Sequence, residues 1–131
     1  MQNLSQTPRL ITILQKAKEA YMFWYDCCQT LTKNHRYTLG QRIDNLFCDL
    51  IEAMVTACFL SKQEKLPYIR HAIRKADTLK IFLMILWETK SLDNKKYLEL
   101  SVKLEEIGRM LGGWQGQVLK QNSPDIKTGE K

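Results

Sequence analysis

Helix-breaking residues are scarce in this sequence. Only three of its 131 residues are proline and six are glycine. Because proline and glycine interrupt regular secondary structure, their scarcity favours a few long helices over many short strands joined by turns. Apolar residues make up 44% of the chain, which excludes a wholly disordered protein and allows one domain with a sizeable core.

Metal-binding spacings are also absent. The four cysteines include no C-x-x-C pair, and His35 and His71 stand at no zinc-finger spacing. Cys48 and Cys58 fall inside apolar helical runs, where a thiol behaves as a small hydrophobic side chain. We therefore expect reduced core cysteines, and neither a metal nor another cofactor.

The motifs that carry chemistry or membrane insertion are missing too. The sequence holds no nucleophile elbow, no H-E-x-x-H, no phosphate-binding glycine loop and no repeated E-x-x-H of the di-iron bundles. Its strongest apolar run, Ile81 to Trp87, is far too short to span a membrane, and no signal peptide begins the chain. We expect a cytoplasmic protein that is not an enzyme.

Four segments carry apolar residues at alternating spacings of four and three, which is the pattern of bundle helices. They cover residues 8–31, about 39–60, 67–89 and about 92–120. The predicted inward-facing residues are Leu10, Leu14, Ala17, Tyr21, Trp24, Cys28 and Leu31; Leu39, Ile43, Leu46, Leu50, Met54 and Ala57; Ile69, Ile73, Ala76, Leu83 and Leu86; and Tyr97, Leu100, Leu104, Ile107, Leu111, Trp114 and Val118.

Capping residues and short connections complete the fold prediction. Thr7 and Ser91 suit helix N-caps, Thr38 with Gln41 forms a capping box, and Pro67 suits a first helical position. The short connections indicate antiparallel neighbours. We predict an all-α, antiparallel up-down-up-down four-helix bundle over residues 1–120, followed by a disordered polar tail at 121–131.

Three features go beyond bundle formation. Gly108, Gly112 and Gly116 line one face of the last helix, which indicates either close packing within the bundle or contact with another subunit or partner. Lys80 falls in the predicted inward seam. Either the seam shifts to Leu79 and the lysine reaches outward, or its charge faces a wet, functional surface.

Positive charge is concentrated in the third segment. The chain carries a formal net charge of +6, and residues 61–90 alone carry seven basic and three acidic side chains, a net of +4. Arg70 and Arg74 share one helix face, which can follow a phosphate backbone. The alternative is a solvated face held by salt bridges, for example from Arg74 to Asp77.

Two motifs carry a family resemblance. Residues 36–43 read RYTLGQRI and residues 106–114 read EIGRMLGGW. In this order they resemble the accessory variability protein (Avd) of diversity-generating retroelements, and the wider family of four-helix-bundle proteins encoded in ribosomal RNA intervening sequences. The resemblance runs from about Leu10 to Lys120. Its motif residues are Tyr37, Thr38, Gly40 and Arg42 in the first stretch, and Gly108, Arg109, Gly112, Gly113 and Trp114 in the second.

The resemblance implies a function without chemistry. Proteins of this kind, encoded by bacteria or phages, form homopentameric barrels. They bind RNA and DNA, and they bind the retroelement reverse transcriptase during mutagenic reverse transcription. Lys80 falls where relatives place a basic residue, while Met84 stands where some carry a second one. The predicted nucleic-acid-binding residues are Arg70, Arg74, Lys75, Lys80, Arg36, Lys62 and Lys65.

Two other functions remain open from the sequence. One is an oligomer of the ribosomal intervening-sequence type with a structural or RNA-binding role. The other is a helical oligomer that binds no nucleic acid. A neighbouring reverse transcriptase gene distinguishes the retroelement protein from the first, and salt-dependent retention on RNA distinguishes both nucleic-acid binders from the second.

Overall fold

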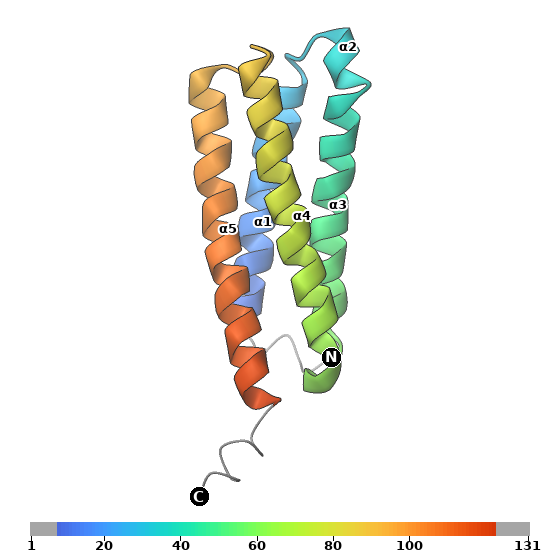
Figure 1. Cartoon of the computed structure of the whole chain (residues 1–131), viewed down its shortest axis with the longest axis vertical. Helices are drawn as coiled ribbons and strands as arrows, with labels where there is room; N and C mark the ends of the chain where they lie inside the picture. The colour runs from blue at the N-terminus through green and yellow to red at the C-terminus, as the bar shows by residue number, and fades with distance from the viewer. Residues whose placement is uncertain (1–7, 123–131) are drawn as a thin grey trace, which may run out of the picture.

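The computed structural model describes residues 8–122, with side chains from residue 11 onward, and this part of the chain is all-helical. Four long helices lie side by side and alternate in direction (Figure 1). They are α1 (Pro8–Cys28), α3 (Leu39–Cys58), α4 (Lys62–Glu88) and α5 (Asn94–Gln121), with the single-turn α2 (Lys33–Arg36) between the first two. Helix α3 packs on α4, α4 on α5, α5 on α1 and α1 on α3, so the four-helix bundle is confirmed.

One continuous apolar core joins the four helices. Its largest fully buried side chains include Trp24 of α1 and Phe47 of α3, and no polar or charged residue within 11–122 is buried. The predicted inward residues of α3 from Ile43 to Ala57, and of α5 from Leu100 to Val118, are all buried. Their heptad pattern therefore predicted the inner faces correctly.

The seam predicted for the first segment is correct at Ala17, Trp24 and Leu31, which are buried, and is one residue off at the positions between them. Ile13, Ala20 and Cys27 are buried, whereas Leu14 and Tyr21, which the heptad pattern pointed inward, lie at the edge of the core. The buried positions 13, 17, 20, 24, 27 and 31 still alternate by four and three, so the heptad repeat holds and only its phase differs from the prediction. The small Ala20 lets α1 approach its neighbours, and Tyr21 keeps its hydroxyl at the margin.

The same change of phase explains the position of Lys80 in α4. Leu79 is fully buried, while Lys80 lies at the edge of the helix with 32% of its side chain exposed. The outward alternative is confirmed, because a leucine next to the lysine fills the core position that the charge would otherwise occupy.

The helix starts differ from the sequence prediction in two places. Helix α4 begins at Lys62 and includes Pro67, whose missing N–H removes a single backbone bond near the helix start. The N-cap of α5 is Asp93, not Ser91, and its carboxylate accepts from the Lys96 N–H at 2.8 Å. A carboxylate is favoured there by the positive end of the helix dipole.

The predicted capping box at Thr38 is wrong. Its hydroxyl donates to the Asn34 carbonyl at 2.6 Å and caps no N–H of α3. The unpredicted α2 lies directly upstream and is capped by the Thr32 hydroxyl, which accepts from the His35 N–H. A Cβ on Gly40 would stand 2.9 Å from the His35 carbonyl oxygen, so this close approach of α2 to α3 requires glycine.

The cysteines divide between core and surface. Cys58 and Cys27 are buried, as expected for structural thiols, but Cys48 is exposed, so the prediction of a core position for it is wrong. Burial raises the pKa of Cys27 to about 11 and raises the pKa of Cys58 as well. Both thiols are therefore kept in the unreactive protonated form. Residues 123–131 of the predicted tail lie outside the described residues, whereas Gln121 ends α5 and Asn122 is its C-cap.

The turn from α4 to α5 has an unusual residue at its centre. The Ser91 N–H donates to the Leu86 carbonyl at 2.8 Å, and the Lys90 N–H donates to the Trp87 carbonyl at 3.0 Å. This is a Schellman motif, whose left-handed position usually holds glycine. Here Lys90 adopts φ 65°, the one positive φ of a non-glycine residue in the described chain. A side chain in this conformation costs roughly 1–2 kcal/mol.

A tyrosine–carboxylate hydrogen bond joins α1 to α3. The Tyr21 hydroxyl donates to Asp44 Oδ1 at 2.8 Å, and this bond raises the pKa of Tyr21 from 10.0 to about 12. We expect Tyr21→Phe to lower the free energy of unfolding by about 1 kcal/mol at neutral pH. Urea denaturation followed by circular dichroism measures this loss, and Tyr37→Phe, at a side chain that is 64% exposed, is the control.

The pH dependence follows from the raised pKa. The neutral phenol is favoured in the folded state, so its stabilisation is complete below about pH 10 and is lost as the pH rises from 10 towards 12. The difference between wild type and Tyr21→Phe should shrink over that range. A constant difference from neutral pH to above pH 11, or a Tyr21 that titrates with the exposed tyrosines by absorbance, contradicts this assignment.

Candidate functional site

The outer face of α4 carries two exposed arginines without ionic partners. Arg70 and Arg74 lie one turn apart, and neither guanidinium forms an ion pair or hydrogen bond within the described residues. The salt bridge from Arg74 to Asp77 that the sequence allowed is absent, because Asp77 faces Lys80 at 3.8 Å. Both arginines are therefore available to an outside anion.

Two lysines flank these arginines, and both are paired. Lys75 leans towards α3, where its Nζ lies 3.7 Å from Asp49 Oδ2. Lys80 leans towards α5, where its Nζ lies 3.3 Å from Glu105 Oε1. Half-exposed pairs of this kind contribute little to stability, so a phosphate can compete for either lysine at small cost. We call the four residues Arg70, Arg74, Lys75 and Lys80 the α4 basic face.

The other predicted nucleic-acid-binding residues lie apart from the α4 basic face. Arg36 donates to the Gln29 carbonyl at 2.8 Å and to the Leu31 carbonyl at 3.4 Å, so it closes the chain after α1. Lys65 donates to the Ala57 carbonyl at 2.6 Å and closes the end of α3. Lys62 is exposed at the start of α4. Figure 1 places α2 and the start of α4 at opposite ends of the bundle.

The glycines of α5 do not pack within the bundle. A Cβ on Gly112, Gly113 or Gly116 would meet nothing within 4 Å, and one on Gly108 would meet only the Lys80 amine at 3.6 Å. Packing inside the described chain is therefore the wrong explanation for this face, and it is open to an outside contact. Trp114 points the other way and is buried in the core.

The remaining motif residues have separate roles. Arg42 places its guanidinium 5.9 Å from the centre of the Phe82 ring and so connects α3 to α4. Arg109 and Tyr37 are exposed. His35 lies in α2 with its Nδ1 against the Ser91 hydroxyl. It therefore ties α2 to the turn between α4 and α5.

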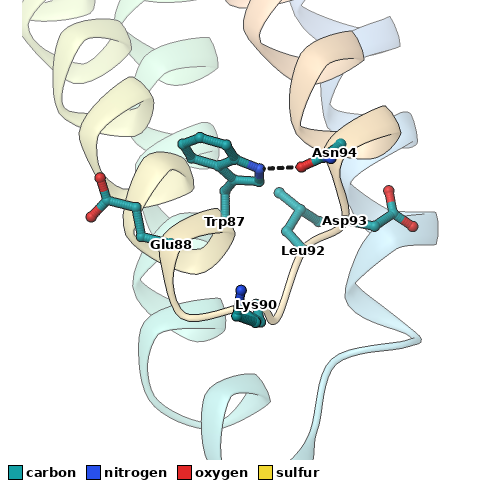
Figure 2. Close-up of a pocket in the computed structure, with 6 residues that line it drawn as sticks. All are labelled: Trp87, Glu88, Lys90, Leu92, Asp93 and Asn94. Carbon is teal, nitrogen blue, oxygen red and sulfur yellow. Dashed lines mark hydrogen bonds between the residues drawn. The ribbon is translucent and has the colours of Figure 1, made fainter.

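Sequence reasoning missed an aromatic pair at that same turn. The rings of Trp87 and Tyr97 are stacked at 4.8 Å with 8° between their planes, and the Trp87 Nε1–H donates to Asn94 Oδ1 at 2.6 Å. Trp87 borders a surface hollow, whose lining residues appear in Figure 2. The available signal was an aromatic residue at the end of one helix followed by another in the first turn of the next.

The described residues show neither a metal centre nor a membrane span. In residues 8–122, no three His, Cys, Asp or Glu side chains are grouped so that they could hold a metal ion. Across the same range, each helix is too short or too polar to cross a lipid bilayer.

Comparison with known families identifies a related family. A family model described as bAvd-like matches residues 11–118, which include both sequence motifs and nearly all of the bundle. Neither a curated protein nor a solved structure matches the chain.

The two lysines at the start of α4 should respond differently to mutation. Burial lowers the pKa of Lys65, whose ammonium satisfies carbonyls at the negative end of α3. We expect Lys65→Met to lower the free energy of unfolding by about 1 kcal/mol, because it removes these hydrogen bonds. Lys62→Met, at an exposed side chain on the same helix, should change it by less than about 0.5 kcal/mol. Equal effects of the two substitutions in urea denaturation would show that Lys65 has no capping role.

Proposed function

This chain belongs to the bAvd-like family, and we propose that it is a non-catalytic accessory protein of a diversity-generating retroelement. In this proposal it binds the template RNA and its complementary DNA, and it binds the reverse transcriptase that copies one into the other. The protein contributes positioning and charge, while the polymerase performs the chemistry.

The unpaired arginines of the α4 basic face are the observation that carries nucleic-acid binding. Residues one turn apart on a helix are separated by about 6 Å along its axis, so Arg70 and Arg74 can reach neighbouring phosphates of one strand. A guanidinium binds phosphate through two parallel hydrogen bonds, and it stays charged at any physiological pH. Phosphate contacts read no base sequence, so this face supports binding without sequence specificity.

Self-association strengthens such weak contacts. The family resemblance implies a homopentamer, and the open glycine face of α5 supports a contact between copies. Each copy carries a formal charge of +6, so an assembly presents several basic faces to the same polyanion. Binding at one face raises the effective concentration of the strand at the next, which increases the overall affinity.

We expect charge reversal on the α4 basic face to weaken RNA binding. The variant replaces Arg70, Arg74, Lys75 and Lys80 by Glu, which removes the phosphate contacts and adds repulsion. Its affinity for a single-stranded RNA should fall at least tenfold, and its dependence on salt should flatten, while helical content by circular dichroism stays unchanged. Fluorescence anisotropy across a salt series measures both quantities.

A control distinguishes RNA binding by the α4 basic face from general attraction by the net charge of the protein. Lys18→Glu with Lys120→Glu reverses two exposed charges away from α4, and Arg70→Glu with Arg74→Glu reverses the same number on it. The α4 double variant should lose more affinity than its control. The proposal fails if the two double variants bind alike, or if wild-type binding does not change with salt.

Co-purification with the reverse transcriptase of the neighbouring gene tests the protein partner.

The open glycine face predicts a variant that folds but does not assemble. A Cβ added at Gly112 would meet nothing within 4 Å among the described residues, and leucine favours the helix over glycine, so we expect the single bundle of Gly112→Leu to stay stable. The bulk should block close approach of a second copy, and the mass by light scattering should fall. Asn45→Leu, at an exposed position of α3, should keep the wild-type mass. An unchanged mass for Gly112→Leu, or a monomeric wild type, excludes this interface.

A further inference from the structure

The turn between α4 and α5 presents a flat aromatic surface that neither the core nor the α4 basic face uses. Tyr97 covers one side of the Trp87 indole, yet 38% of Trp87 is exposed. The indole borders a hollow of about 520 Å³ lined by Trp87, Glu88, Lys90, Leu92, Asp93 and Asn94. A volume of this size is within the range of small-molecule sites in proteins.

The indole is held in a fixed orientation. Its Nε1–H donates to Asn94 Oδ1 at 2.6 Å (Figure 2). Its ring is also stacked on Tyr97 of the next helix. Both contacts are made before any ligand arrives. An aromatic ligand that stacks on Trp87 therefore does not have to order this side chain, and binding loses less entropy.

The hollow is lined by one cation, Lys90, and two carboxylates, Glu88 and Asp93, so Lys90 is the lining residue that can contact a phosphate. Figure 2 shows the carboxylates of Glu88 and Asp93 on opposite sides, both pointing away from the indole, while Lys90 lies on the loop below it. Lys90 stands in the left-handed position where a glycine would be less strained, so the chain accepts a cost that places an ammonium at the hollow.

The hollow also lies along the path of a strand bound to α4. Lys80 precedes Trp87 by seven residues, which is two helical turns and about 10 Å, on the flank of α4 that faces α5. Lys95, in the first turn of α5 beside Asn94, is exposed. A strand held by the α4 basic face can therefore continue to the turn while its phosphates still meet ammonium groups.

We propose that this hollow binds one unpaired nucleobase of single-stranded nucleic acid, stacked on Trp87, with Lys90 contacting an adjacent phosphate. The inference rests on the proposed function, which brings the strand to α4. It adds a preference for unpaired over duplex nucleic acid, because a base within a duplex has both faces covered. Stacking on aromatic side chains tolerates any base, so no sequence preference follows.

Intrinsic fluorescence tests the stacking in the unmodified protein. Of the three tryptophans, Trp24 is fully buried and Trp114 is 5% exposed, so Trp87 is the one that an added ligand can reach. A short oligothymidylate should quench the emission, and an abasic oligomer of equal length should not. Quenching of the same size by both oligomers, or by neither, overturns the inference.

Affinity measurements separate this site from the α4 basic face. Wild type should bind oligothymidylate about 5- to 100-fold more tightly than the abasic oligomer, the range expected for one stacked base. Trp87→Leu should abolish this ratio and leave abasic binding unchanged, whereas Trp87→Phe should retain part of it. Tyr25→Leu, at another exposed aromatic residue, should keep the full ratio. Lys90→Gly relieves the backbone strain and should weaken both oligomers to a similar extent.

The outcomes distinguish the two proposals. If both oligomers bind with salt dependence but equally, the base site is excluded and the proposed function stands. If neither oligomer binds, the base site and the proposed nucleic-acid binding are both excluded. If Trp87→Leu loses the ratio but also unfolds on heating at a lower temperature than Trp87→Phe, the quenching of wild type decides, since that measurement needs no substitution.

Discussion

The whole architecture depends on an apolar seam that contains no charge. Within residues 11–122 the buried side chains are all hydrophobic, so every ionic group must lie at a helix margin or on an outer face. Burying an unpaired charge costs several kcal/mol, and the heptad pattern avoids this by placing Leu79 where Lys80 would otherwise enter. The same seam holds the helices rigidly side by side, and this fixes the spacing between the charges that they carry outward.

Within the basic region, the pairing of each cation decides its role. The lysines at 75 and 80 lean over the grooves towards α3 and α5, where carboxylates meet them, while Arg70 and Arg74 point away from both neighbours. Arg36 and Lys65 have charges of the same sign, yet they serve the backbone by satisfying carbonyls at the ends of α1 and α3. Net charge alone therefore overstates the available surface, and the unpaired arginines mark where an outside anion gains most.

Sequence reasoning recovered what depends on periodicity and missed what depends on contacts between distant segments. The inner faces of α3 and α5 followed from apolar spacing, because the burial of apolar surface is the main driving force of folding and selects one face of each helix separately. The caps were mostly missed. Thr38 and Ser91 have suitable side chains, but the unpredicted α2 and the nearby Asp93 compete with them. The stack of Trp87 on Tyr97 could not be predicted, because the sequence does not show that the end of α4 lies beside the first turn of α5.

The turn between α4 and α5 is the part of the structure from which we infer a preference among nucleic acids. A helix end needs only a glycine to close with little strain, yet this one uses Lys90 in the left-handed conformation next to a fixed indole. In the proposed function the outer face of α4 binds polyanions through phosphate contacts, which carry no base information. An exposed aromatic face distinguishes single strands from duplexes, because only an unpaired base can stack on it. An accessory protein that carries both features would favour unpaired RNA or DNA, the form in which a polymerase takes its template.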